Sequence, residues 1–149
     1  MKIRLAAAKD AKKVADIIKH HSQSDYMGYA TFNEGYIKDK MKKNNFFFVA
    51  EDKDKIVGCI RSSIVDLDLA EIRTLCVDKD QRKKGIATKL LQTTLDFLKK
   101  NKMRKIVARS KADNKTAIKL FEKMGFEQEG YFREHYREGI DIVQMAKFL

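Results

Sequence analysis

Proline and tryptophan are absent from this chain of 149 residues, and cysteine occurs only twice. Cys59 and Cys76 are too few for a disulfide scaffold, and their spacing is not that of zinc ligands. The histidines His20, His21 and His135 show no ligand spacing either, so we expect no bound metal. Both thiols are therefore expected to be reduced, packed side chains of a cytoplasmic protein.

Long hydrophobic runs are also missing. No window approaches the roughly 18 consecutive apolar residues of a membrane span, and the N-terminal run MKIRLAAAKDAKK lacks the apolar core of a signal peptide. We therefore expect no association with a membrane. The hydrophobic fraction of 44% is ordinary for a globular protein, and the length predicts a single domain over residues 1–149.

Positive charge is what the chain has in excess. Lys and Arg number 32 against 21 Asp and Glu, which gives a formal net charge of +11. Such a balance suits a phosphorylated cofactor, a nucleic acid or an acidic surface. Solvated lysine-rich helix faces, or adaptation to habitat, would explain it equally. A nucleic-acid partner is disfavoured, because no recognised nucleic-acid-binding motif is present.

Hydrophobic periodicity divides the chain into alternating kinds of element. It predicts helices over 10–20, 34–43, 86–101 and 114–124. It predicts strands over 2–6, 46–51, 56–64, 69–77, 105–110, 126–132 and 140–148. This order is typical of an α/β (α+β) protein, with a mixed sheet of about seven strands flanked by about four helices.

Residues 71–87, EIRTLCVDKDQRKKGIA, carry the clearest functional signal. A predicted strand passes through a charged turn, and an amphipathic helix begins at once. The unpaired N–H groups and the dipole of a helix start favour a bound phosphate. Gly85 and Ala87 would let a pyrophosphate approach the backbone, and Arg82, Lys83 and Lys84 add positive charge. The alternative is an ordinary strand–turn–helix with a solvated basic turn.

The run from Glu71 to Ala87 resembles motif A of the GNAT N-acetyltransferase superfamily. The run Asn114-x-x-Ala117-x-x-x-Phe121-x-x-x-Gly125-Phe126 is similar to its motif B. The predicted element order agrees from end to end, so the resemblance covers essentially the whole chain. It implies the GNAT fold and an N-acetyltransferase that moves an acetyl group from acetyl-CoA to a primary amine, by direct attack in a ternary complex.

The resemblance also implies roles for individual residues. The pyrophosphate of coenzyme A is expected on the loop 82–87 and the first helical turn beyond it, and the pantetheine arm is expected to pair with a strand backbone. The asparagine of motif B contacts the cofactor in this family, although it also suits a helix N-cap. The expected cofactor-binding residues are Leu75, Cys76, Val77, Arg82, Lys83, Lys84, Gly85, Ile86, Ala87, Thr88, Asn114 and Phe121.

Phe121 departs from the family's pattern. Many members carry a tyrosine here that is thought to protonate the departing thiolate, and phenylalanine cannot. A thiol of pKa about 8.5 is a tolerable leaving group without a dedicated acid. The general acid therefore stays open, with Cys76, Tyr131 and Tyr136 as substitutes that are more simply read as packing residues.

An ammonium of pKa about 10.4 must lose its proton before it attacks. Glu71 is the expected general base, because Ala70-Glu71-Ile72 resembles the base-bearing strand of histone-type members of this family. Strand alternation would place Glu71 on the same face as Arg73 and Leu75. The alternative is an edge-strand glutamate paired with Arg73 or Arg61.

The acceptor site is expected over residues 21–43 and 131–139, with an aromatic wall of Tyr26, Tyr29, Phe32 and Tyr36. The tail from Tyr136 is loosely similar to ribosomal-protein and N-terminal acetyltransferases, which suggests a protein or peptide amine, and small amines stay open. A coenzyme-A-binding module without turnover, and less readily a nucleic-acid-binding protein, are the alternatives. A homodimer is also left open.

Overall fold

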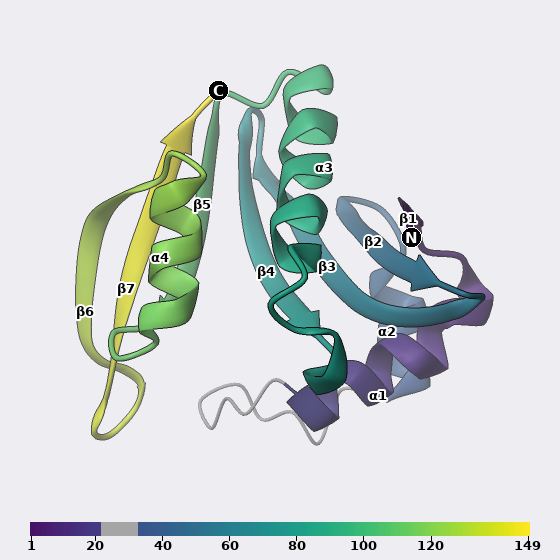
Figure 1. Cartoon of the computed structure of the whole chain (residues 1–149). Coiled ribbons are helices and arrows are strands. Elements are labelled where there is room, and N and C mark those ends of the chain that lie inside the picture. The colour runs from purple at the N-terminus through teal and green to yellow at the C-terminus, as the bar shows by residue number, and fades with distance from the viewer. Residues whose placement is uncertain (22–32) are drawn as a thin grey trace.

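The computed structural model describes residues 1–21 and 33–149, in which seven strands form one sheet (Figure 1). The strands are β1 Lys2–Leu5, β2 Asn45–Asp52, β3 Lys55–Asp66, β4 Leu69–Val77, β5 Lys105–Lys111, β6 Glu127–Arg137 and β7 Ile140–Phe148. The helices are α1 Ala11–His21, α2 Glu34–Lys40, α3 Ile86–Lys100 and α4 Lys115–Lys123, with short 3-10 turns η1 Ala8–Asp10 and η3 Lys79–Gln81.

The sheet order is β1-β2-β3-β4-β5-β7-β6, and only the pair β4–β5 is parallel within it. The predicted mixed sheet and its four helices are confirmed. The largest difference lies in β6, which was predicted to end at Phe132 and runs to Arg137, where it pairs with Ile140. Its last five residues are exposed and carry no apolar alternation, so the sequence pattern could not reveal them.

Helices cover both faces of the sheet. One apolar cluster joins α3 and α4 to the sheet and includes Leu90, which is 0% exposed. The second joins α1 and α2 to the other face, through residues such as Val14, Ile37 and Val49. Successive residues of β2 alternate between the two clusters, as Phe48 and Val49 do, which is why this strand reads as almost continuously hydrophobic.

A glycine in β3 sets how closely α3 approaches the sheet. A Cβ atom at Gly58 would lie 3.1 Å from the carbonyl oxygen of Cys76 and 3.2 Å from Cδ1 of Leu90. A larger residue would therefore push α3 outward. The missing side chain holds the start of α3 beside the end of β4.

β4 and β5 are paired over only part of their lengths. Their register runs from Leu69↔Lys105 to Ile72↔Ala108, after which β4 continues to Val77 and β5 to Lys111 without further pairing between them. Figure 1 shows the two strands separating at this end. The backbone edge of β4 that faces β5 is thus left open beyond Ile72, and the candidate site is built around this separation.

Candidate active site

The loop between β4 and α3 is fastened to the end of the strand. Arg82 Nε donates to the carbonyl oxygen of Val77 at 3.3 Å. Lys83 and Gly85 both take positive φ, 62° and 77°, so the chain reverses sharply before the helix. These contacts place the start of α3 next to the open edge of β4.

The first turn of α3 has no side-chain cap. Gly85 is the N-cap residue, and its carbonyl accepts the N–H of Lys89 at 3.0 Å. The N–H groups of Ile86, Ala87 and Thr88 therefore lack intrahelical acceptors and lie at the positive end of the helix dipole.

The space beside this turn is open. A Cβ atom placed on Gly85 would meet no other atom within 4 Å. Lys83 and Lys84 are exposed beside it, whereas the Ile86 side chain is buried in the α3-side core, so only its backbone can face a ligand. The residues present thus fit a pyrophosphate, because free N–H groups, open space and positive charge coincide.

The strand residues expected to hold pantetheine present their backbone rather than their side chains. Leu75 packs on the α3-side core, and Cys76 is 7% exposed within the α1-side core. Cys76 faces Cys59 across the β3–β4 pair, and both side chains are buried. Burial raises the pKa of the Cys59 thiol well above its ordinary value.

Motif B supplies a cap and a core residue. Asn114 Oδ1 accepts the N–H of Ala117 at 3.2 Å, so the N-cap interpretation of this asparagine is confirmed. Phe121 is 6% exposed and packs edge-on against Phe126, with ring centroids 5.1 Å apart. Its ring therefore anchors α4 on the sheet.

Glu71 lies in the middle of the sheet, not at an edge. Its Cα partners are Ser63 on β3 and Val107 on β5. Its carboxylate Oε2 is 3.4 Å from Nη2 of Arg73, so the pairing with Arg73 is confirmed, and its side chain is 17% exposed. Glu71 is thus one residue before Ile72, the last residue of β4 that pairs with β5 before the two strands separate.

The prediction that the side chains of Glu71 and Leu75 lie on the same face of β4 is wrong. The register passes from Arg61↔Thr74 to Ser62↔Ile72, which leaves Arg73 as the extra residue of a β-bulge. The bulge shifts the alternation by one, so Ile72 and Leu75 both contact the α3-side core. Glu71 therefore faces the opposite side of the sheet, the side of α1 and α2.

Asn45 and Ser63 were missed from the sequence, and Arg61, considered there as a partner of Glu71, is bonded to Asn45 instead. Arg61 donates to Asn45 Oδ1 through Nε at 3.3 Å and Nη2 at 3.0 Å, and the Ser63 hydroxyl donates to the same oxygen at 2.7 Å. A charged residue within the apolar run of β3 was the available signal, since a central strand rarely carries one without a purpose.

The two tyrosines considered as acids differ in position. The Tyr131 hydroxyl donates to Asp141, and this hydrogen bond raises the pKa of Tyr131 and makes it a poorer acid. The Tyr136 hydroxyl accepts from Arg109 Nη1 at 2.9 Å, next to the strand that separates from β4. The predicted aromatic residues Tyr26, Tyr29 and Phe32 lie outside the described residues.

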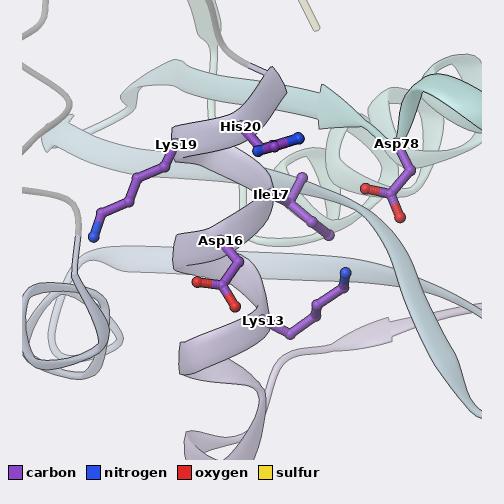
Figure 2. A pocket seen from close by; sticks show the side chains of 6 residues that line it. All are labelled: Lys13, Asp16, Ile17, Lys19, His20 and Asp78. Atoms are coloured by element: carbon purple, nitrogen blue, oxygen red, sulfur yellow. The ribbon is translucent and has the colours of Figure 1, made fainter.

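A hollow of about 390 Å³ lies between α1 and the end of β4 (Figure 2). Its lining residues are Lys13, Asp16, Ile17, Lys19, His20 and Asp78. His20 and Asp78 extend into it from opposite sides, but no expected cofactor-binding residue lines it.

Within residues 1–21 and 33–149, no three His, Cys, Asp or Glu side chains are grouped so as to hold a metal ion. In the same part of the chain, no helix is both long and apolar enough to cross a membrane.

Comparison with known proteins agrees with this geometry. The model of the acetyltransferase (GNAT) family matches residues 13–126. The chain is 33% identical over 106 residues to N-alpha-acetyltransferase 30 of Schizosaccharomyces pombe, covering 66% of this chain and 69% of that protein. It spans only 27% to 45% of the length of further curated relatives.

Solved structures show the same fold. Ribosomal-protein-alanine N-acetyltransferase from Brucella melitensis superposes with a TM-score of 0.87 at 20% identity, over 100% of both chains. The ribosomal-protein-S18-alanine N-acetyltransferase from Escherichia coli gives a TM-score of 0.84 at 22% identity, over 97% of this chain and 91% of that one. With the family model matching most of its length, the chain belongs to the acetyltransferase (GNAT) family.

Proposed function

We propose that this protein transfers the acetyl group of acetyl-CoA to a primary amine. The carrying observation is the coincidence of two features: β4 loses its β5 partner after Ile72, and the uncapped start of α3 stands beside that open edge. One feature offers backbone to an extended ligand arm, and the other offers N–H groups to a phosphate.

Different residues of the chain would hold different parts of the cofactor. The N–H groups of residues 86–88 would hold the pyrophosphate, with charge from Arg82, Lys83 and Lys84. The backbone of residues 75–77 would pair with the pantetheine arm. Asn114 uses its carbonyl oxygen as a helix cap, which leaves its amide nitrogen to donate to a ligand.

When bound, acetyl-CoA supplies an activated acyl group, so that a C–N bond forms as the C–S bond breaks. Glu71 would take the proton of the attacking amine, directly or through a water. Its position on the α1 side of the sheet supports this role, because the proposed pyrophosphate site at the N–H groups of residues 86–88 (the phosphate seat) belongs to the opposite, α3 side. The amine would therefore enter from the face opposite the cofactor.

The leaving thiolate has no dedicated acid in this scheme. Phe121 has no ionisable group, and Tyr131 is engaged with Asp141. Tyr136, held by Arg109, is the remaining candidate, and a thiolate can also take its proton from water. For the same reason a module that binds coenzyme A without turnover is the second candidate function.

The acceptor we favour is the amino group of a peptide or protein. The names of the yeast N-alpha-acetyltransferase and of the ribosomal-protein-alanine acetyltransferases support this class. Small amines are the competing acceptors.

A thiol-release assay with a panel of amines tests the proposal. Thiol release that requires both acetyl-CoA and an amine is the expected result. Thermal stabilisation by coenzyme A, about 2.7 kcal/mol at 100 times its Kd, without release on any amine would instead favour the binding module. Neither stabilisation nor release would contradict both.

A further inference from the structure

The α1 side of the sheet carries an excess of positive charge where β4 and β5 separate. Arg73 and Arg109 are the residues that follow the last β4–β5 pair on the two strands. Arg61 stands on β3 opposite Thr74, with its guanidinium 5.8 Å from the centre of the Phe47 ring in the α1-side core. Glu71 lies on the same side of the sheet, and its carboxylate is 3.4 Å from Nη2 of Arg73.

Arg61 is the least expected of these charges. The residue is 8% exposed, and within residues 1–21 and 33–149 no carboxylate lies within 4.0 Å of its guanidinium. Its hydrogen bonds go to a neutral amide oxygen, Asn45 Oδ1, which already accepts the Ser63 hydroxyl. A charge that is nine-tenths buried is costly unless an opposite charge compensates it.

Among the residues that the structure describes, Arg109 is also held by neutral groups alone. It donates to Gln144 Oε1 at 3.0 Å and to the Tyr136 hydroxyl at 2.9 Å, and its guanidinium lies 5.0 Å from the centre of the Phe132 ring. These contacts fix the orientation of the guanidinium without cancelling its charge.

Two other partly buried cations of this chain, Lys105 and Arg4, are paired with carboxylates. Lys105, on the same strand face as Arg109, is 2.7 Å from Glu129. Arg4 is paired with both Asp10 and Glu51 at 2.8 Å. The absence of a carboxylate at Arg61 and Arg109, within the described part of the chain, is therefore a local property of this face.

We propose that the acceptor carries a side-chain carboxylate on the same residue as its reacting amine, as does an N-terminal Asp or Glu of a peptide, or the free acidic amino acid. This inference rests on the proposed function. Glu71 attracts the ammonium group, and Arg61 and Arg109 receive the carboxylate, which arginine binds with two parallel hydrogen bonds. The cofactor phosphates cannot fill this role, because their seat belongs to the α3 side.

The test uses peptides that differ only at residue one, Glu against Gln and Asp against Asn, together with free Glu and Gln. The full-length protein is assayed for kcat/KM on each acceptor. We expect the acidic peptide to be favoured by at least about tenfold, which corresponds to about 1.4 kcal/mol. A preference confined to peptides identifies a protein N-terminus, and one confined to the free acid identifies an amino acid substrate.

Charge variants locate the source of the preference. Arg109→Gln and Arg61→Gln should each lower the Glu/Gln ratio severalfold, mainly by raising KM for the acidic acceptor, while Kd for coenzyme A stays unchanged. Arg104→Gln is the matched control, because Arg104 is an exposed residue next to β5 that is paired with Asp68. It removes the same charge and should leave the ratio intact.

Two results would overturn the inference while leaving the proposed function in place. One is transfer at equal efficiency to Glu and Gln peptides. The other is a preference that survives in both Arg109→Gln and Arg61→Gln proteins that melt cooperatively. Failure to acetylate any amine would instead overturn the proposed function, and this inference with it.

Discussion

Replacing Gly85 by aspartate places a negative charge at the predicted phosphate seat. The added Cβ would meet no atom within 4 Å, so sterics do not oppose the change. The φ of 77° strains any L-residue by about 1–2 kcal/mol. Gly139 offers a matched control, because it has the same φ of 77° and equally open surroundings. It lies between β6 and β7, away from α3.

The expected loss of affinity follows from Coulomb's law. Two charges about 4 Å apart repel by about 1 kcal/mol in water and about 4 kcal/mol at the effective dielectric of a protein surface. We therefore expect Gly85→Asp to weaken coenzyme A binding by about 2–4 kcal/mol, on the order of 30- to 1,000-fold. Isothermal titration calorimetry measures the Kd of both variants, and thermal unfolding shows whether they are equally folded. A Gly85→Asp protein that melts like Gly139→Asp and binds coenzyme A as tightly as the unaltered chain would refute the seat.

Four further changes test other parts of the account. Glu71→Gln should lower kcat/KM by roughly 10²–10⁴ near neutral pH, less at higher pH where more amine is already neutral, with coenzyme A affinity unchanged; near-full activity across pH 6–9 would make this carboxylate structural. Phe121→Tyr should fit in volume and raise turnover at low pH if its ring lies near the thioester, so a pH–rate profile unchanged from that of Phe121 would count against that position. Leu90→Ala should cost about 2–5 kcal/mol of unfolding free energy in urea titrations, because Leu90 is 0% exposed; a loss below about 1 kcal/mol would contradict its place in the core. The Arg4 guanidinium and the Ala7 N–H hold the pKa of Asp10 below its ordinary value, so this carboxylate stabilises the fold above about pH 4 and the contribution is lost as the pH falls through the lowered pKa. Asp10→Asn should thus cost about 1–3 kcal/mol at pH 7, a difference from the unaltered chain that shrinks in acid and that urea titrations at several pH values would show.

The features of the site that depend on residues close together in the chain could be predicted from the sequence. A strand, a basic turn and a helix around Gly85 can be identified from alternation, helical spacing and one glycine, because each depends on near neighbours. The capping role of Asn114 is local in the same way. The element order followed from hydrophobic periodicity, and its agreement with the family pointed to the fold.

The parts that failed depend on pairing between distant segments. The bulge at Arg73 exists only in the register of β4 against β3, and it moved Glu71 to the opposite face from Leu75. The separation of β4 from β5 after Ile72 is likewise invisible within either strand. Arg61 and Arg109 lie 48 positions apart in the chain, so only the folded sheet reveals that they serve the same face.

Mass spectrometry of a peptide acceptor tests the central claim most directly. The purified protein is incubated with a peptide whose only amine is its N-terminal amino group, with acetyl-CoA or with coenzyme A alone. The account predicts an increase by one acetyl group that requires acetyl-CoA and is strongly reduced in Gly85→Asp. Equal acetylation by the unaltered chain and by a folded Gly85→Asp protein, or none by the unaltered chain on peptides with acidic and neutral first residues, would contradict it.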